Sequence, residues 1–382
     1  MTDQEIYQSW IDHMTNNSGM KFTGNEHMMR TITSFVSPEE AAFTTGFPLF
    51  PPRTIEEIAE IKQMDIPELK ERIEALARKG MIYESIRGDS VRYRMWQFGE
   101  IFMRVPLWPG RDEEPVRTMS QHGNKWYPTM IMGRKADVHA GLRSIPINKT
   151  VEDTRAILPF EDILQVVDKY EFHSVSYCCC RMRYNLDPAY PDTPFPLETC
   201  LHFNELGRYI VKNGLGREIT KEETLEILKK AADAGLIHGI QNTEEAPETI
   251  CNCDLEYCTF LRPYHQLGFD KSMDQSNYAV QVTPKTCKAC GLCVKRCPMD
   301  AIQMKFSAES TNKFRKAVVV DTDLCIGCGV CVHKCPSESI TLKRKETITR
   351  SPKTGMDLMR INYMARHAAR QKGGSSQQSG TD

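Results

Sequence analysis

Early in the chain, polar and apolar positions predict three helices followed by a β-hairpin. Two capping boxes, Ser37-Pro38-Glu39-Glu40 and Thr54-Ile55-Glu56-Glu57, begin the first two helices. The third helix is predicted over 65–80, where apolar residues recur at helical spacing and a glycine follows. Residues 81–83 and 91–95 then have the pattern of two short strands joined by a tight turn.

The middle of the chain alternates helical and strand patterns. A helix is predicted over 160–170 and a strand over 174–177. A second helix begins at the capping box Thr220-Lys221-Glu222-Glu223 and ends at Gly235, and a short strand over 236–238 follows it. Because the loops between these elements carry cysteines, we expect a mixed α/β scaffold that presents thiols.

Tryptophans, methionines and several prolines in the region over 98–150 indicate an extended connecting segment there. Its tryptophans and methionines, among them Trp108, Trp126 and Met130, are expected to belong to the core. The Gly/Ser/Gln-rich tail that begins at Gln371 is expected to be flexible and outside the fold.

Length and charge narrow the possible classes of protein. The chain has 382 residues, which at about 150 residues per domain predicts two or three domains. With 40% hydrophobic residues and a formal net charge of −1, neither wholesale disorder nor a general attraction to nucleic acid or anionic membranes is expected. No apolar run approaches the roughly 18–20 residues of a membrane span, and the polar first residues do not form a secretory signal. We therefore expect a soluble, cytoplasmic protein.

The cysteines indicate the chemistry. There are fifteen, and all of them follow residue 177 in three short regions. A large chain without an export signal is not a disulfide scaffold, so clustered thiols are expected to bind metal. No phosphate loop, dinucleotide fingerprint or nucleophile elbow accompanies them.

Two runs near the carboxyl end share the spacing C-x2-C-x2-C-x3-C-P. They are Cys287-Lys-Ala-Cys290-Gly-Leu-Cys293-Val-Lys-Arg-Cys297-Pro298 and Cys325-Ile-Gly-Cys328-Gly-Val-Cys331-Val-His-Lys-Cys335-Pro336. This spacing is typical of bacterial ferredoxins, in which three thiolates bind one four-iron cluster and the fourth binds the other. Two zinc knuckles would not use four cysteines per run and a trailing proline.

On these motifs, residues 280–345 resemble the two-[4Fe-4S] ferredoxins. The resemblance implies that Cys287, Cys290, Cys293 and Cys335 hold one cluster, and that Cys325, Cys328, Cys331 and Cys297 hold the other. Strands are expected near 301–304, 317–320 and 339–342, with an inserted loop near 307–316. The region carries twelve Lys/Arg against five Asp/Glu, which either neutralise the anionic clusters or steer an acidic redox partner.

Seven further cysteines lie in the middle region. Six of them are the candidate ligands of a third centre, a subset of which is expected to bind: Cys178, Cys180, Cys200, Cys251, Cys253 and Cys258. In each C-x-C pair, side chains two apart in an extended segment would share a face. Zinc, a reactive thiol or redox disulfide, and inert buried cysteines are the alternatives to an iron–sulfur centre. His202 and His238 are expected to be structural.

The order C-x-C-R, C, C-N-C, C resembles a middle domain that precedes ferredoxin modules in iron–sulfur proteins of anaerobic microbes. Those relatives are richer in cysteine around the last group, where this chain has Asp254, Glu256 and Tyr257. The resemblance implies a third iron–sulfur cluster, but this departure leaves its ligand set open.

The helices and hairpin over 37–96 resemble a winged helix-turn-helix domain. A recognition helix needs a positive face, but the third helix carries Glu68, Glu71 and Glu74 beside its four cations. Arg87, Arg92 and Arg94 on the hairpin are the feature that favours DNA. We therefore expect a structural or docking module and not a nucleic-acid-binding one.

Together these patterns predict an α+β multidomain protein with a winged helix, an α/β cysteine-bearing middle domain and a ferredoxin-like module. The expected divisions are 1–36, an N-terminal extension; 37–97, winged helix; 98–150, connecting segment; 151–270, metal-binding middle domain; 280–345, two-[4Fe-4S] domain; and 346–382, a C-terminal extension. The expected function is single-electron relay to or from a partner oxidoreductase or larger complex. The alternatives are an oxidoreductase with a catalytic middle centre and a redox-sensing winged-helix regulator of transcription.

Overall fold

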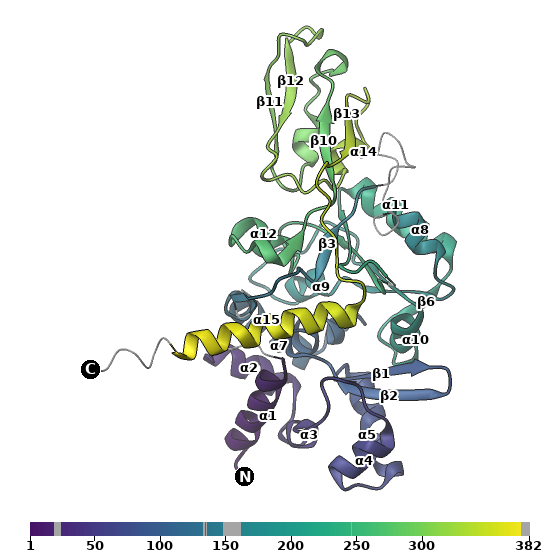
Figure 1. Ribbon diagram of the computed structural model, residues 1–382, viewed down its shortest axis with the longest axis vertical. Coiled ribbons are helices and arrows are strands. Elements are labelled where there is room, and N and C mark those ends of the chain that lie inside the picture. Colours follow the sequence, from purple (N-terminus) through teal and green to yellow (C-terminus); the bar gives the residue numbers. More distant parts are fainter. Residues whose placement is uncertain (19–23, 133, 135, 148–161, 246, 376–382) are drawn as a thin grey trace, which may run out of the picture.

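The computed structural model describes residues 1–18, 24–132, 134, 136–147, 162–245 and 247–375. Three regions follow one another along the long axis of the molecule (Figure 1). An N-terminal helical region lies at one end, a seven-stranded sheet lies in the centre, and a small C-terminal module lies at the other end. None of the described helices combines the length and apolar character that a bilayer span requires.

The N-terminal region contains the helices and hairpin that the sequence predicts. Ser37 and Thr54 each cap a helix with a complete capping box, and Gly80 ends the third predicted helix in the left-handed conformation. The elements of this region are α1 (Asp3–Ser18), α2 (Glu26–Phe35), α3 (Pro38–Thr44), α4 (Ile55–Lys62), α5 (Ile66–Lys79), β1 (Ile82–Arg87) and β2 (Ser90–Met95).

The described residues of 98–147 are largely helical and do not form an extended segment, so that prediction is wrong. They form α6 (Phe98–Met103), a 3-10 turn (Val105–Leu107) and the 19-residue helix α7 (Glu114–Met132), which contains Pro128. Trp108, Trp126 and Met130 are buried in the largest apolar core, as expected. That core includes Trp10 of α1, whose indole donates to the Thr44 hydroxyl at 2.8 Å, so the N-terminal extension is an integral part of the fold. The rest of the predicted segment, 148–150, lies outside the described residues.

The central sheet has the strand order β6-β4-β5-β8-β7-β3-β9. Its strands are β3 (Leu142–Ser144), β4 (His173–Tyr177), β5 (Glu198–Phe203), β6 (Arg217–Ile219), β7 (Ile237–Gln241), β8 (Thr249–Cys253) and β9 (Met273–Asp274). All neighbours are antiparallel except β3 and β9. The sheet is therefore not built from parallel βαβ units, and it takes strands from both sides of the predicted range 151–270.

The two faces of the sheet have different coverings because side chains alternate along each strand. Val175, Leu201 and Ile250 face α8 (Ile163–Asp168) and α11 (Lys221–Ala234) in one apolar core. Their alternating neighbours, including Cys200 and Cys251, face the opposite side, where α9 (Cys179–Asn185) and α12 (Leu261–Gln266) lie. The N-terminal part of the helix predicted over 160–170 lies outside the described residues. Helix α10 (Asn204–Lys212) contacts both the sheet and β1.

The C-terminal module contains two antiparallel strand pairs: β10 with β13, its first and last strands, and the hairpin of β11 with β12. Its elements are β10 (Tyr278–Val282), α13 (Leu292–Arg296), β11 (Ile302–Phe306), β12 (Lys316–Val320), α14 (Val330–His333) and β13 (Ile340–Arg344). The three expected strands are confirmed, and the predicted insertion is the loop that joins β11 to β12.

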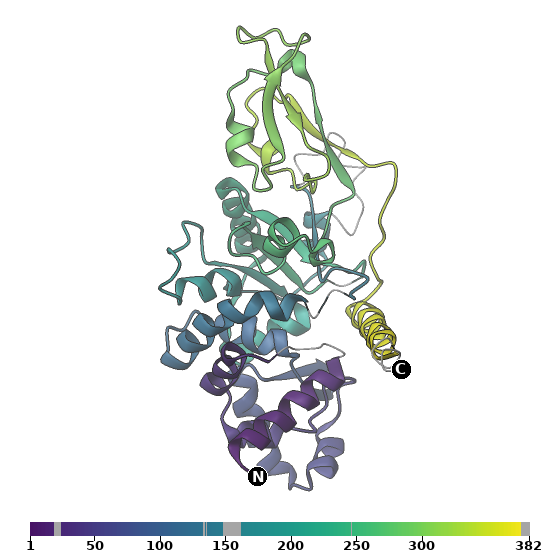
Figure 2. The same cartoon turned by 90° about the vertical axis from the view of Figure 1, so that its left-hand side faces the viewer.

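After the module the chain returns to the rest of the protein. The backbone amides of Glu244 and Glu245 donate to the carbonyls of Pro352 and Lys353 at 3.0 and 2.8 Å. Helix α15 (Gly355–Ser375) then lies against the helical region (Figures 1 and 2). Residues 371–375 are therefore helical and not part of a flexible tail, while 376–382 lie outside the described residues.

The contact between α15 and the loop before β3 depends on one asparagine. The Asn362 carboxamide accepts from the amides of Val138 and His139 at 2.9 and 3.1 Å and donates to the His139 carbonyl at 2.8 Å. Arg366 of the same helix pairs with the buried Asp137.

We expect Asn362→Ala to leave the Val138 and His139 amides without acceptors and to lower the opening free energy of α15 by about 1–3 kcal/mol. Native-state hydrogen exchange of the α15 amides measures this directly. Met364→Ala, at a neighbouring position that is 61% exposed, is the control and should leave exchange unchanged. Equal protection in both variants would show that α15 is held by other contacts.

Candidate metal centres

All seven cysteines of the middle region line one cavity. The cavity has an empty volume of about 500 Å³, including its opening to solvent, and its lining includes Cys178, Cys179, Cys180, Cys200, Cys251, Cys253 and Cys258. Two strands, a helix start and a loop position them: β5 carries Cys200, β8 carries Cys251 and Cys253, the start of α9 carries the first three, and Cys258 precedes α12. The six predicted ligands are therefore brought together. Cys179 is a seventh that the sequence did not single out.

Only one of the two C-x-C pairs lies in extended backbone, where both side chains share a face. Cys251 and Cys253 lie on β8 in extended backbone, as expected. Cys178 instead caps α9, which begins at Cys179, so the helical start of α9 and not an extended segment directs Cys180 toward the cavity.

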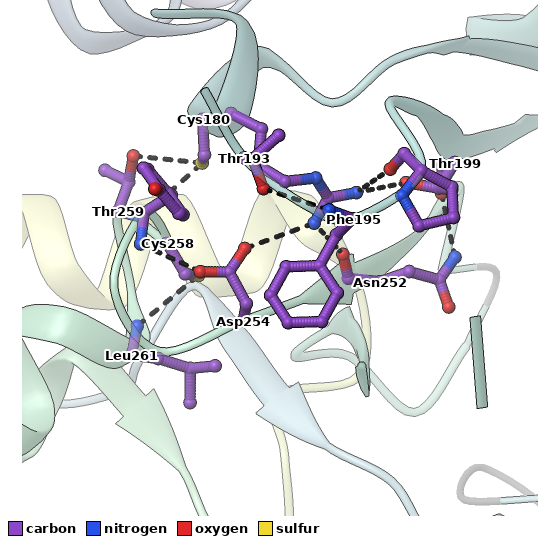
Figure 3. A network of polar contacts seen from close by, with 12 residues as sticks. Cys180, Thr193, Phe195, Thr199, Asn252, Asp254, Cys258, Thr259 and Leu261 are labelled. Carbon is purple, nitrogen blue, oxygen red and sulfur yellow. Dashed lines mark hydrogen bonds and ion pairs between the residues drawn. The ribbon is translucent and has the colours of Figure 1, made fainter. Parts of the chain in front are cut away.

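The thiols contact one another in a continuous series that centres on two sulfurs. Hydrogen bonds from Cys178, Cys179 and Cys258 hold the pKa of Cys180 well below its usual value. Hydrogen bonds from Cys200 and Cys253 do the same for the pKa of Cys251. Cys180 also contacts the Thr259 hydroxyl at 3.1 Å and accepts from its amide at 3.4 Å, and the Leu261 amide donates to Cys258 at 3.4 Å (Figure 3). The site thus presents sulfur that is already surrounded by hydrogen-bond donors, the arrangement found around metal-bound thiolates.

Arginines surround this cavity. Arg181 donates to the carbonyls of Asn252 and Pro196, each at 2.8 Å, and to Asp254 at 3.3 Å; Figure 3 shows Asp254 beside Cys258. Arg104, from the turn after α6, lines the cavity too, and Glu100 with the nearby Cys179, Cys251 and Cys200 raises its pKa although burial opposes the rise. Sequence reasoning missed Arg104 because it is far from any cysteine along the chain.

Arg183 is a fully buried cation for which the described residues supply no carboxylate. Its Nη1 contacts the Met103 sulfur at 2.6 Å, and its guanidinium lies over the rings of Tyr127 and Tyr184. Its Nε and Nη2 have no hydrogen-bond partner. Burying an uncompensated charge is costly, so a cation in this position requires nearby negative charge, and Cys180 is close enough to raise its pKa.

His202 and His238 are structural, as expected. His202 contacts the hydroxyls of Ser176 and Thr249 at 2.9 and 3.3 Å, and His238 contacts the Asn252 carboxamide at 2.7 Å. Neither histidine lines the cavity. Burial lowers the pKa of His238 to about 4, so this ring is neutral near pH 7.

In the C-terminal module, the four cysteines of each run do not stay together. Burial and the neighbouring Cys335, Cys290 and Cys287 raise the pKa of Cys293 to about 11, which places Cys335 of the second run beside the first. Burial together with Cys297 and Cys325 raises the pKa of Cys328 to about 12. The last cysteine of each run therefore crosses to the other run.

The crossing produces two groups of four cysteines, and a second cavity lies at one of them. Its empty volume is about 310 Å³, and Cys297, Cys325, Cys328 and Cys331 all line it. The Ala301 amide donates to the Cys297 sulfur at 3.3 Å, and in the other group the Ala289 amide donates to the Cys287 sulfur at 3.4 Å. Four thiols, an apolar lining and amide donors suit a cubane bound by thiolates.

Comparison with known families bears on this module. Residues 286–339 match the family model of the 4Fe-4S dicluster domain. No curated protein and no solved structure gave a significant match to the chain.

The C-terminal module is a 4Fe-4S dicluster domain. It gives the protein an iron–sulfur electron-transfer role, and the cysteines at 287–297 and 325–335 are its cluster-binding runs. Within the described residues, no three or more Cys, His, Asp or Glu side chains are placed to hold a single metal ion. The same is true of the dicluster domain, because the ligands of a four-iron cluster surround the whole cluster and do not converge on one metal atom.

A single apolar core joins the dicluster domain to the middle cavity. Buried Cys253 and Cys258 pack in it together with Ile326 and Cys328. Cys297 and Cys325 are packed against the same core from the dicluster side, and Cys251 is packed against it from the sheet side. The second cysteine group of the dicluster domain therefore faces the middle cysteines.

Gly327 makes the close approach between the Cys325–Cys328 loop and the start of β10 possible. Its φ is +68°, and a Cβ there would lie 2.1 Å from the Tyr278 carbonyl oxygen and 2.3 Å from the Ser276 hydroxyl. The corresponding position in the first run is Ala289, which has a similar φ of 53°. Glycine at 327 is thus required by the lack of space and not only by its backbone conformation.

We expect Gly327→Ala to displace the Cys325–Cys328 loop and to reduce bound iron by about four atoms per chain. Gly291→Ala is the matched control, because its φ is +74° but nothing lies within 4 Å of the added methyl group. Both variants carry the same backbone strain of about 1–2 kcal/mol, so iron lost only in Gly327→Ala measures the clash. Equal iron in both variants would contradict this assignment.

Proposed function

We propose that the protein relays single electrons through two four-iron clusters of its dicluster domain and a third iron–sulfur centre in the middle cavity. The first cluster (cluster I) would be held by Cys287, Cys290, Cys293 and Cys335. The second (cluster II) would be held by Cys297, Cys325, Cys328 and Cys331. The crossing of Cys335 and Cys297 between the two runs supports this assignment. Bound clusters of this kind supply one-electron exchange at potentials set by burial, charge and hydrogen bonds to sulfur.

The third centre is supported above all by the convergence of seven thiols on one cavity. Its candidate ligands are Cys178, Cys180, Cys200, Cys251, Cys253 and Cys258, to which the structure adds Cys179. The uncompensated Arg183 requires an anion nearby, and a thiolate-bound cluster would supply one. Amide donors to Cys180 and Cys258 would stabilise the bound thiolates.

An iron–sulfur cluster fits this cavity better than zinc does. A tetrahedral zinc site needs four donors within about 2.3 Å of one atom. The described residues offer no such group, whereas their thiols line the walls of a larger space. Zinc is therefore the second candidate for the cavity, and metal analysis separates the two.

The order of the relay follows from the shared apolar core. Cluster II would be the neighbour of the middle centre, because Cys325 and Cys328 share a core with Cys253 and Cys258. Cluster I would then lie at the end of the electron-transfer chain that is farther from the middle centre. Since the chain carries no flavin or nicotinamide fingerprint, we place the electron donor or acceptor on a partner oxidoreductase or larger complex.

The helices and hairpin at the N-terminus would form a winged-helix-like unit that serves for docking within the protein. The hairpin packs on the middle region: Glu84 pairs with Lys212 at 2.9 Å, and Glu205 contacts the hydroxyls of Ser85 and Tyr83. Of the hairpin arginines that favoured DNA, Arg94 stacks over Tyr83 and Trp96 within the fold. These contacts support a structural role over a redox-sensing regulator of transcription.

A catalytic middle centre is the second candidate function, and one observation favours it. Cys178, Cys180 and Cys251 remain partly accessible at the cavity, so a small molecule could approach the centre. A centre that binds exogenous cyanide or another small ligand without loss of iron would support catalysis there over simple relay.

We expect anaerobically prepared protein to contain about twelve iron atoms per chain, four for each of three clusters. Cys180→Ser and Cys253→Ser should each reduce this to about eight and leave the signals of the dicluster domain intact. Iron and zinc are counted by plasma emission spectrometry, and clusters by electron paramagnetic resonance after dithionite. About eight iron atoms in the wild type and both variants would exclude the third cluster, and one zinc per chain would identify the alternative.

Arg183→Met should lower the reduction potential of the middle centre by tens of millivolts, on the order of 1 kcal/mol, because a nearby positive charge favours the reduced and more anionic state. Arg183→Lys keeps the charge and should lower the potential less. Both are measured by anaerobic redox titration with paramagnetic resonance detection. Identical potentials in wild type and Arg183→Met would show that Arg183 does not compensate a redox centre.

A further inference from the structure

The dicluster domain presents its two cysteine groups to very different surroundings. Of the fifteen cysteines, all within the described residues, Cys290 alone is exposed. Cys328 and Cys331 of the other group are buried, and Ile326 and Val330 beside them pack into the apolar core shared with the sheet. Cys290 therefore gives another protein a point of approach to the first group, whereas no cysteine of the second group is exposed.

Contacts with α11 close the side of the domain that faces the sheet. Asp233 at the end of α11 pairs with Lys334 and with His333, the latter at 2.8 Å. Arg296 donates to the carbonyls of Ala232 and Asp233 at 2.9 and 3.1 Å. The hairpin β11–β12 instead extends away from the sheet at the far end of the molecule (Figure 1).

This hairpin is anchored beside Cys287. The Asn312 carboxamide donates to the Cys287 carbonyl at 2.7 Å, and the Thr311 hydroxyl donates to the Lys285 carbonyl at 2.8 Å. Whatever binds the hairpin is thus brought to the loop that carries the exposed Cys290.

The hairpin carries exposed aromatic and basic side chains together. The hairpin patch is defined as Lys305, Phe306, Lys313, Phe314 and Lys316. Phe306 is 72% and Phe314 56% exposed, Phe306 lies directly across from Lys316, and the Lys313 ammonium is 4.9 Å from the Phe314 ring centre. Among the described residues, no carboxylate forms an ion pair with any of the three lysines.

The charge of this part of the chain is strongly one-sided. Residues 285–316 contain eight Lys/Arg and two Asp/Glu, while the whole chain is nearly neutral. Neutralisation of buried clusters does not require cations on the tip of an exposed hairpin, because those side chains are solvated. Cations around a small apolar centre instead match the composition of a docking surface.

We infer that the hairpin patch docks a redox protein whose cofactor edge is ringed by carboxylates, and that single electrons pass between this partner and cluster I beside Cys290. The inference rests on the proposed electron-transfer function. It specifies the class of redox partner and the cluster at which electrons enter or leave the protein. In each productive encounter the partner loses one electron and cluster I gains it, or the reverse, with no atom transferred. Charge attraction sets the rate of encounter, and the aromatic rings fix the docked orientation.

The test uses holoprotein and an acidic flavodoxin as the probe. Oxidised flavodoxin is titrated calorimetrically at about 20 mM and about 300 mM ionic strength, where charge attraction is weakly and strongly screened. Lys313→Glu/Lys316→Glu should weaken flavodoxin binding at low ionic strength at least about ten-fold relative to the wild type. At high ionic strength the affinities of the wild type and the variant should become similar. Electron transfer from reduced flavodoxin should slow by a similar factor, whereas reduction by dithionite should not change.

Lys70→Glu/Arg78→Glu is the matched control, because it makes the same charge change on exposed positions of α5 at the other end of the molecule. It should alter binding less than about two-fold. Equal weakening in both variants, or binding by the wild type that does not depend on salt, would overturn the docking surface. Wild-type protein without a four-iron signal after dithionite would instead overturn the proposed function itself, so the two failures are distinguishable.

Discussion

The structure depends on bringing many sulfur ligands out of water at a tolerable cost. Eight cysteines of the dicluster domain and seven of the middle cavity are mostly buried, and a cysteine becomes anionic when it binds metal. Burial alone opposes this charge, as the raised pKa of Cys293 and Cys328 shows. The protein offsets the cost with backbone amides that donate to sulfur and with the guanidinium groups of Arg104 and Arg181, which line the middle cavity. Arg183 adds a third positive charge close to Cys180.

Secondary structure governs how this is achieved in the middle region. A β-sheet separates its two faces by alternation, so β5 and β8 can pack Leu201 and Ile250 into an apolar core while Cys200 and Cys251 line a cavity behind them. Cys178–Cys180 approach from the start of α9 and Cys258 from the loop before α12, which completes the ring of thiols. Neither a helix nor a sheet alone could supply seven sulfurs to one space.

Sequence reasoning succeeded where short-range rules apply. The capping boxes at Ser37 and Thr54, the glycine stop at Gly80 and the strands of the dicluster domain depend on neighbouring residues and were placed correctly. The spacing of the two cysteine runs is equally local, which is why the dicluster domain was recognisable from its motifs.

Long-range pairing was the main source of error. Leu142–Ser144 joins the sheet only because β7 and β9 lie beside it, and α7 is a helix because it packs on α2 despite Pro128. Arg104 reaches the cavity through the tertiary fold, and no spacing along the chain could reveal it. The C-x-C rule failed at Cys178–Cys180 because α9 begins at Cys179 and a helix replaces extended backbone.

The return of the chain after β13 has a mechanical consequence. The dicluster domain is connected on one side through β9 and β10 and on the other through the segment whose carbonyls at Pro352 and Lys353 bind the loop after β7. The second connection removes rotations of the domain that a single connection would allow. These two connections and the shared apolar core therefore restrict how far the inner cysteines can move from the thiol-lined cavity, and no disulfide contributes to this restraint.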